Sequence, residues 1–341
     1  MTETSEVMTE TPDLTKEPEA PDPLDVVPQV LDLVRLTGAI FFHYDFASPW
    51  AYTSPPTLEL EGALPPGSGS LVMFHIIDKG SCWVALDDGV RHPLSAGDVV
   101  VLPYGDAHSF GSDEPAAAVP IASLLPSTPW VEFPYLRYGG DGEDTHMVCG
   151  FLRGDAVLFD PVLRALPPLI VVRPPEGPAA EWVRASVEYA VVATQASLAS
   201  PSAGGSLLAR LLFTEIVTQY LHDARDDELT GWLAALRDPV VGPAIARMHA
   251  RPDRAWTVAE LAREVTTSKT VLVDRFHALL GRPPIRYLTE WRINLASGLL
   301  RTTDLGVAEV ASRVGYTSEE AFSRAFKRSL GMAPAHWRLA G

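Results

Sequence analysis

A segment near the C-terminus occurs a second time about fifty residues further on. Residues 259–265 read AELAREV and residues 308–314 read AEVASRV, an offset of 49. After one extra residue the offset becomes 50, and the matched residues are Phe276 with Phe326, Leu280-Gly281 with Leu330-Gly331, Pro284 with Pro334, and Tyr287 with Trp337. One supersecondary unit of about thirty residues therefore occurs twice, and the fold must accommodate both copies.

The first copy predicts two short helices joined by a tight turn. Thr257 followed by Glu260 is a capping box at a helix start. Apolar residues then recur at helical spacing, at Val258, Leu261, Ala262 and Val265. After a turn at Thr266-Thr267, Ser268 is a favourable cap for a second helix that we expect to end at Gly281.

The second copy repeats this pattern. Its apolar stripe is Val307, Val310, Ala311 and Val314, Gly315 ends the first helix, and Ser318 and Gly331 bound the second. Between the copies, Pro284–Arg301 predicts a helix with a buried stripe of Leu288, Trp291, Leu295 and Leu299. Two helix-turn-helix units on a rigid connector can place two recognition helices in successive major grooves, about 34 Å apart.

The charge distribution agrees with a local nucleic-acid footprint. The chain carries a net charge of −16, yet residues 239–341 hold 15 Lys and Arg against 9 Asp and Glu. Residues 1–238 hold 12 against 34. A basic C-terminal part on an acidic body favours one DNA-binding face over general nucleic-acid binding.

Residues 256–338 resemble the AraC-type transcriptional regulators, most closely in the run LGVAEVASRVGYTSEEAFSRAFKRSLGMAPAHWR. The resemblance implies a regulator that binds double-stranded DNA at an operator, and contacts RNA polymerase if it is an activator. It places the recognition residues at Lys269, Thr270, Val273 and Asp274 in the first unit and at Glu319, Glu320, Ala321 and Arg324 in the second. Arg324, Lys269 and Lys327 are the strongest candidates for base or phosphate contacts.

Two residues of the first unit depart from the family pattern. Thr266 stands where the family often has Gly, at a turn position that favours a left-handed backbone. Asp274 stands where the family often has Arg, and a carboxylate near phosphates is repulsive, although it can accept from cytosine N4. We therefore expect the second unit to dominate affinity.

Residues 22–173 show short β-like runs separated by Gly, Pro and Asp, which indicates a sandwich or barrel. The predicted strands include Ala39–Phe46, Ser70–Ile77, Ser81–Leu86 and Asp98–Leu102. The segment GDVVVLPYGDAH, ending at His108, resembles a cupin motif, and the wider stretch resembles the cupin-like sensor domain that precedes AraC-type DNA-binding domains. The predicted fold class is α+β, with a cupin-like β-barrel, a helical linker and an all-α C-terminal domain.

The barrel offers candidate effector ligands but an incomplete metal motif. Metal-dependent cupin enzymes usually carry His-x-His, and here His75 is followed by Ile76-Ile77. We predict no metal, no other cofactor and no enzymatic activity. The candidate pocket residues are His43, His75, Trp83, Tyr104 and His108, with core packing as the alternative for the histidines and aromatics.

The remaining segments complete the predicted organisation. Residues 1–21 are acidic and polar and predict a disordered tail without a signal peptide. Residues 174–238 predict a linker and helices over Ala180–Ala199 and Gly204–His222, the second with a stripe of Leu207, Leu208, Leu211, Leu212, Ile216 and Tyr220. We expect this region to make a homodimer, with internal packing as the alternative, and residues 239–341 to be the DNA-binding domain.

Three functions remain to be compared. The first is a cytoplasmic, effector-responsive regulator with no membrane span. The second is a cupin-type metalloenzyme with an accessory DNA-binding tail. The third is a redox sensor that uses Cys82 and Cys149 on the same scaffold, although two small hydrophobic residues near strands are the simpler interpretation of these cysteines.

Overall fold

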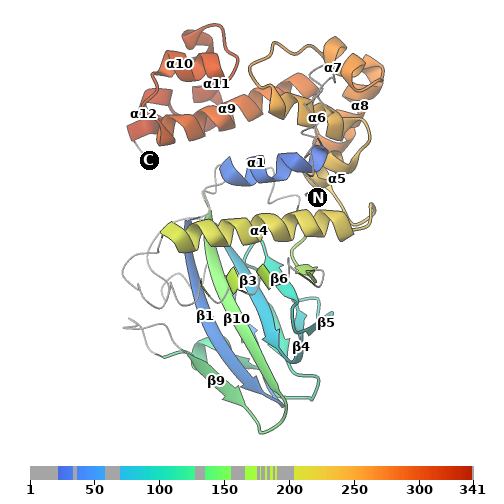
Figure 1. Ribbon diagram of the computed structural model, residues 1–341, viewed down its shortest axis with the longest axis vertical. Helices are drawn as coiled ribbons and strands as arrows, with labels where there is room; N and C mark the ends of the chain where they lie inside the picture. The colour runs from blue at the N-terminus through green and yellow to red at the C-terminus, as the bar shows by residue number, and fades with distance from the viewer. Residues whose placement is uncertain are drawn as a thin grey trace, which may run out of the picture.

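A computed structural model describes residues 22–33, 37–57, 70–126, 135–154, 166–174, 177, 181–182, 185–186, 189 and 203–339. The chain forms a β-rich N-terminal part, a long helix across it, and a layer of helices above (Figure 1). The predicted tail, residues 1–21, lies outside the described residues, as does most of the predicted helix over Ala180–Ala199.

The larger sheet has the strand order β11-β6-β3-β10-β1-β9 among the described residues. Its strands are β1 (Thr37–Ala47), β3 (Ser70–Lys79), β6 (Val99–Leu102), β9 (Leu136–Gly139), β10 (Asp144–Gly154) and β11 (Ile170–Val172). The long antiparallel pairs of β10 with β1 and β3 form its centre. The strands expected at Ala39–Phe46, Ser70–Ile77 and Asp98–Leu102 correspond to β1, β3 and β6.

The smaller sheet has the order β5-β4-β7-β2-β8 among the described residues. It contains β2 (Ala51–Ser54), β4 (Ser81–Ala85), β5 (His92–Ser95), β7 (His108–Gly111) and β8 (Val119–Pro120). Between β6 and β7 the chain turns at Pro103-Tyr104-Gly105, where Gly105 has a φ of 63°. This is the Pro-x-Gly turn that the cupin-like motif predicts.

Described side chains of both sheets pack together in the space between them. Residues of alternate parity on each strand point inward, because successive side chains of a strand face opposite sides. Phe46, Trp50, Tyr52 and Phe110 form a stacked aromatic series, with neighbouring ring centroids 4.2 to 6.1 Å apart. Aliphatic, Met and Cys side chains complete this core.

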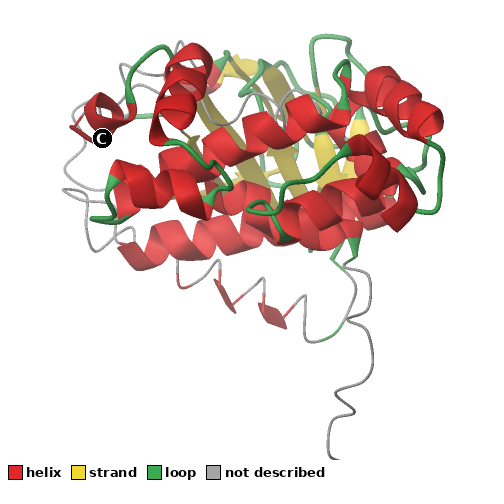
Figure 2. Cartoon of the chain, turned by 90° about the horizontal axis from the view of Figure 1, so that it is seen from above, coloured by secondary structure: helices red, strands yellow, loops and turns green. Residues whose placement is uncertain are grey.

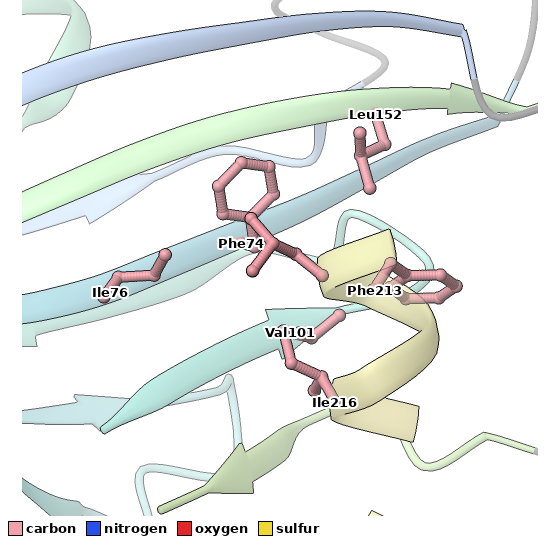
Figure 3. Close-up of a pocket in the computed structure, with 7 residues that line it drawn as sticks. Phe74, Ile76, Val101, Leu152, Phe213 and Ile216 are labelled. Atoms are coloured by element: carbon pink, nitrogen blue, oxygen red, sulfur yellow. The ribbon is translucent and has the colours of Figure 1, made fainter. Parts of the chain in front are cut away.

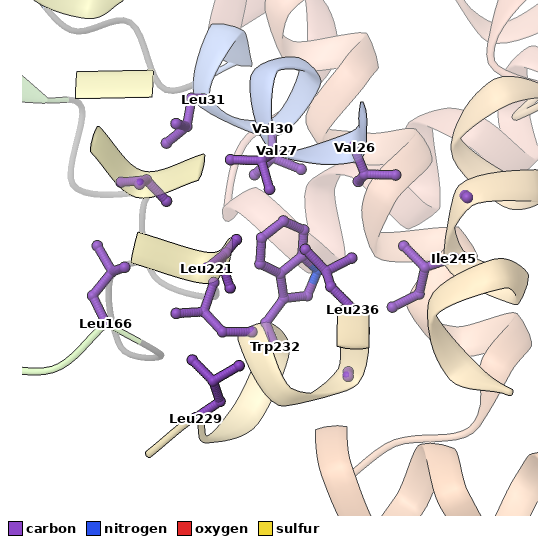
Figure 4. Packing of buried hydrophobic residues seen from close by; sticks show 14 of the residues in the cluster. Val26, Val27, Val30, Leu31, Leu166, Leu221, Leu229, Trp232, Leu236 and Ile245 are labelled. Carbon is purple, nitrogen blue, oxygen red and sulfur yellow. The ribbon is translucent and has the colours of Figure 1, made fainter. Parts of the chain in front are cut away.

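A second core begins on the outer face of the larger sheet. Helix α4 (Ala203–Asp223) lies across that face, and α1 (Val26–Leu33) lies on the other side of α4 (Figure 1). Buried residues of the sheet, α4 and α1 belong to one cluster that continues into the C-terminal helices around Trp232 (Figure 4). The barrel and the C-terminal helices therefore share a continuous apolar contact.

The C-terminal part is helical. It consists of α5 (Gly231–Arg237), α6 (Val241–Ala250), α7 (Val258–Glu264), α8 (Lys269–Leu280), α9 (Pro284–Thr302), α10 (Val307–Arg313), α11 (Glu319–Leu330) and α12 (Pro334–Leu339). Seen from above, these helices form a layer over the sheets (Figure 2). Within the described part of the chain, no helix has the length and apolar character that crossing a membrane requires.

Two further short helical turns complete the described structure. One, Pro23–Asp25, precedes α1 and is capped by the side chain of Asp22. It packs against α5 and α6, so the start of the described chain contacts the C-terminal helices. The other, Ile121–Ser123, follows β8 and contacts β2.

Candidate nucleic-acid interface

The first helix-turn-helix unit consists of α7 and α8. Thr257 and Glu260 form the predicted capping box: the Thr257 Oγ1 accepts from the Glu260 amide at 3.2 Å, and Glu260 Oε2 accepts from the Thr257 amide at 2.9 Å. These bonds to Thr257 lower the pKa of Glu260. Thr266, in the turn, has a φ of 52°, which confirms the left-handed backbone expected there. Ser268 caps α8 and Gly281 ends it in a left-handed conformation.

The second unit consists of α10 and α11 and has the residue types that its geometry requires. Gly315 occupies the turn position equivalent to Thr266, with a φ of 84°. A Cβ there would lie 2.7 Å from the Arg292 guanidinium and from the backbone oxygen of Asp253, so glycine is needed for space as well as for backbone freedom. Ser318 caps α11 and Gly331 ends it, as predicted.

Helix α9 connects the two units and is held at both ends. Tyr287 Oη accepts from Trp232 Nε1 at 2.9 Å and lies 2.9 Å from His249 Nε2. The His249 ring, whose Nε2 shares this hydrogen bond with the Tyr287 hydroxyl, stacks on Trp291 at a centroid distance of 3.6 Å. Burial lowers the pKa of His249 and raises that of Tyr287, so both groups are neutral.

The far end of α9 packs against the second unit. The stripe predicted for this helix is buried at Leu288 and Trp291 and half-buried at Leu295 and Leu299. Arg338 of α12 donates to the backbone oxygens of Leu300, at 3.0 Å, and Leu305. These contacts fix α9 rigidly between the two units.

Most cations of the C-terminal part are already engaged within the protein. Arg292, Arg301 and Arg338 bind backbone oxygens or stack on rings, and ion pairs join Arg251 to Asp253, Arg247 and Arg254 to Glu264, Arg275 to Asp238, Arg282 and Arg286 to Glu290, and Arg313 to Glu309. Among the described residues 239–339, the cations outside these ion pairs, backbone bonds and ring contacts are Arg263, Lys269, Arg324, Lys327 and Arg328. Three of them lie on α11, so that helix presents the densest free positive charge.

The exposed face of α11 carries most of the predicted contacts. Glu319, Glu320, Arg324 and Lys327 are exposed, and Ala321 is half-buried. The two glutamates lie in the first turn, where the helix dipole favours carboxylates. Arg328 is also exposed, and sequence reasoning missed it, although its basic side chain directly follows Lys327.

The exposed face of α8 is different in character. Lys269, Thr270 and Asp274 are exposed and Val273 is half-buried. Arg275 is bound by Asp238, with its Nη1 2.7 Å from Oδ2, and Asp238 also accepts from the backbone at the start of α6. Sequence reasoning missed this ion pair, which occupies a cation of α8, because it joins residues 37 positions apart.

The barrel interior holds two of the predicted effector ligands. His75 and His108 are each 2% exposed, with ring centroids 5.2 Å apart. His75 Nδ1 lies 2.8 Å from Cys149 Sγ, and His108 Nδ1 donates to the Asp106 backbone oxygen at 2.9 Å. The Nε2 atom of each ring is buried without a hydrogen-bond partner in the structure.

Burial determines the protonation of these groups. It lowers the pKa of His108 to about 4, and it lowers the pKa of His75, with His108 adding to the effect. Burial also raises the pKa of Cys82 to about 12 and that of Cys149 well above its usual value. Two neutral imidazoles and two thiols therefore occupy this core, which lacks the electropositive surroundings of reactive cysteines.

The structure does not bring the other predicted pocket residues to this cluster. His43 alternates with the inward Tyr44 on β1 and so faces outward. Trp83 lies on the outer face of the smaller sheet, where its Nε1 donates to the Ser112 oxygen at 2.8 Å and Arg91 stacks 4.0 Å over its ring. Tyr104 is 39% exposed and donates to the Leu166 oxygen.

The described residues contain no group of three or more His, Cys, Asp or Glu side chains arranged to hold a metal ion. The site that the structure does provide is a pair of helix-turn-helix units with free cations on α11. That combination defines a DNA-binding regulator with a β-rich domain attached.

Comparisons with known proteins identify its family. Residues 25–222 match the cupin family and residues 261–340 match the helix-turn-helix domain family. A putative AraC-like transcription regulator of Streptomyces lividans is 33% identical over 273 residues, covering 79% of this chain and 86% of that protein. The HTH-type transcriptional regulator AlkR of Acinetobacter baylyi is 29% identical over 320 residues, covering 92% and 99%.

Among solved structures, the DNA-binding domain of the global transcriptional factor AdpA in complex with a target DNA is 34% identical. It covers 30% of this chain and 92% of that chain, with a TM-score of 0.29. The chain belongs to the AraC-type transcriptional regulators with an N-terminal cupin domain. It is a DNA-binding transcriptional regulator, and the relatives named here are regulators rather than enzymes.

Proposed function

We propose that α11 makes the principal operator contacts, with Arg324 reading a base edge in the major groove and Lys327 and Arg328 bound to phosphates. The observation that carries this proposal is the concentration of unpaired cations on the exposed face of α11. A free guanidinium needs no internal ion pair to be broken before it binds guanine O6 and N7. Helix α8, with Lys269, Thr270, Val273 and Asp274, makes the weaker second contact.

The test begins with selection of an operator from random duplex DNA by the full chain. Arg324→Ala should then weaken binding of that operator by about 1–3 kcal/mol at fixed salt and relax discrimination at one base position. Arg225→Ala is the matched control, because Arg225 is exposed and paired with Asp227 outside the DNA-binding helices. Equal affinities of the Arg324 and Arg225 variants would remove Arg324 from the interface.

We propose further that the N-terminal domain, residues 22–173, senses an effector and that the helical region 174–238 joins it to the DNA-binding domain. Signal transfer requires that the effector binds one arrangement of the two domains better than another. The continuous core from the sheet through α4 to Trp232 supports such coupling. We also propose that the protein is cytoplasmic. It would contact RNA polymerase if it activates transcription.

The same helical region is proposed to form a homodimer. Large apolar side chains are exposed there: Trp182, Tyr189, Leu207 and Leu211. Leu207 and Leu211 are one helical turn apart on α4 and so share a face, and an exposed apolar face of this kind supports a partner surface. Leu207→Glu with Leu211→Glu should reduce the sedimenting mass to that of a monomer, while His222→Glu on the same helix should not. A wild-type chain that sediments as a monomer at all concentrations contradicts the dimer.

A further inference from the structure

An apolar pocket lies between α4 and the outer face of the larger sheet (Figure 3). The sheet and the helix each contribute to its wall, which consists of Phe74, Ile76, Val101 and Leu152 from the sheet and Leu212, Phe213 and Ile216 from α4. These side chains leave about 10 Å³ unfilled. The pocket is separate from the His75 and His108 cluster, because Phe74 and Ile76 face outward while His75, between them, faces the barrel interior.

One outward position of the sheet beside this pocket wall carries no side chain. Strand β10 turns Val148 and Leu152 outward under the helices, and the outward position between them is Gly150. Gly150 pairs with Phe74 on the neighbouring strand β3. Because glycine has no side chain, the centre of the covered face lacks one of the residues that would otherwise fill it.

The wall also defines the chemistry of an occupant. All the lining surface is apolar, and none of the lining residues carries a polar side-chain atom. A water molecule in the pocket would find no side-chain partner, and a charged or hydrogen-bonding ligand would lose its hydration without compensation. The pocket therefore suits an uncharged hydrocarbon and rejects a carboxylate of the same shape.

The position of the pocket connects it to the DNA-binding helices. Helix α4 ends at Asp223, and Leu221, Ala224 and Trp232 continue its apolar contacts to α5. A ligand larger than the unfilled space can enter only if α4 moves away from the sheet. Such a ligand binds the displaced arrangement better than the closed one, so it shifts the population toward it.

We infer that the interface of α4 with the larger sheet is the effector site, that its ligands are compact uncharged hydrocarbons, and that they act by displacing α4. This inference rests on the proposed sensing function, and it assigns that function to the outer face of the barrel. The interior, where the aromatic series from Phe46 to Phe110 packs, is then assigned to the structural core.

Benzene and benzoate, which differ by one charged group, are suitable probes of the full chain. Benzene should raise the melting temperature in a concentration-dependent way and change affinity for the selected operator by about fivefold or more. Benzoate should do neither. An equal effect of benzoate, or benzene binding without any change in operator affinity, overturns the inference.

Two substitutions at one wall residue, which should change the benzene effects in opposite directions, test whether benzene binds in this pocket. Val101→Ile adds a methylene to the wall and should abolish the benzene effects, while Val101→Ala enlarges the pocket and should strengthen them. Val72→Ile is the matched control, because Val72 is buried on the same outer face but does not line the pocket. Benzene effects that are equal in the Val101→Ile and Val72→Ile variants would contradict the site.

Operator binding separates this inference from the proposed function. A variant that binds the selected operator with wild-type affinity in the absence of benzene is folded, so its response to benzene is informative. If the wild-type chain selects no operator, the proposed DNA contacts fail. If it selects one and ignores benzene, the hydrocarbon site alone fails.

Discussion

Thr266→Gly should stabilise the protein, although it removes a side chain. Thr266 has a φ of 52°, and a β-branched residue in the left-handed region carries about 1–3 kcal/mol of strain. Glycine removes that strain but gives the unfolded chain more conformational freedom, at a cost of about 0.5–1 kcal/mol. The net expectation is about 1 kcal/mol of added stability, or a melting temperature roughly 4–8 °C higher for a DNA-binding domain of about 100 residues.

The neighbouring residue supplies the control. Thr267 has the same side chain in the same turn, and its amide donates to the Ala262 oxygen at 2.8 Å, but its φ is not positive. Thr267→Gly brings the entropic cost without relief of strain, so it should lower the melting temperature. Calorimetry of the three full-length chains measures both changes. Equal destabilisation by the two substitutions would refute the strain at Thr266.

Three further outcomes are expected. Asp274→Arg should tighten operator binding, because it replaces a repulsive carboxylate with one more phosphate contact. The slope of log affinity against log salt concentration should steepen by about one unit. Titrations at several salt concentrations measure this slope, and an unchanged slope would place residue 274 away from the DNA backbone. Tyr287→Phe should cost about 1–3 kcal/mol of unfolding free energy, because it leaves Trp232 Nε1 and His249 Nε2 buried without their hydroxyl partner. Denaturant unfolding measures this cost, and a change in unfolding free energy near zero would contradict a contribution of these hydrogen bonds to stability. Burial lowers the pKa of His108 in the folded chain to about 4, below the roughly 6.5 of an unfolded histidine. The unfolded chain therefore binds the extra proton first, and stability falls as pH decreases from about 6.5 to 4. The His108→Leu variant should lose less stability over that window, and parallel curves of unfolding free energy against pH for the two chains would count against a buried neutral ring.

The repeat made the DNA-binding part predictable residue by residue. The caps at Thr257, Ser268 and Ser318 and the turn at Thr266 are local features, set by residues within a few positions of one another. The family resemblance singled out Thr266 as a position that often holds Gly, and Gly315 occupies the equivalent position in the other turn. Contacts between distant residues have no such signal, so the bridge from Trp232 to Tyr287 was not predicted. The packing of α5 on α8 also crosses the boundary expected at residue 239.

The proposed effector site was harder to predict, because both faces of the larger sheet are covered. A half-exposed strand alternates apolar and polar residues, but β6 reads VVVL and is buried throughout, so its pattern does not say which side chains face inward. Pocket candidates were therefore chosen by residue type, and Trp83 and His43 lie on outer faces. The apolar stripe of α4 predicted burial of Leu212 and Ile216 correctly, and internal packing on the barrel, the alternative to a dimer interface, is what covers these two residues.

The cysteines illustrate the same limit. Spacing did not reveal that Cys149 lies 2.8 Å from His75, on a neighbouring strand of the sheet. Their burial as thiols makes a redox response unfavourable, yet the redox function stays a prediction to be tested. Oxidant should leave operator binding of the wild-type chain unchanged. A loss of binding that Cys82→Ser or Cys149→Ser prevents would support the redox sensor.

Sequence-specific recognition is measured most directly by the ratio of affinities for the selected operator and for a scrambled duplex of equal length, at one salt concentration. We expect the full chain to favour the operator by about a thousandfold or more, as specific regulators do, and the ratio to fall in the Arg324→Ala variant but not in Arg225→Ala. A ratio near one for the wild-type chain, or a ratio that Arg324→Ala leaves unchanged, would contradict sequence-specific recognition through α11.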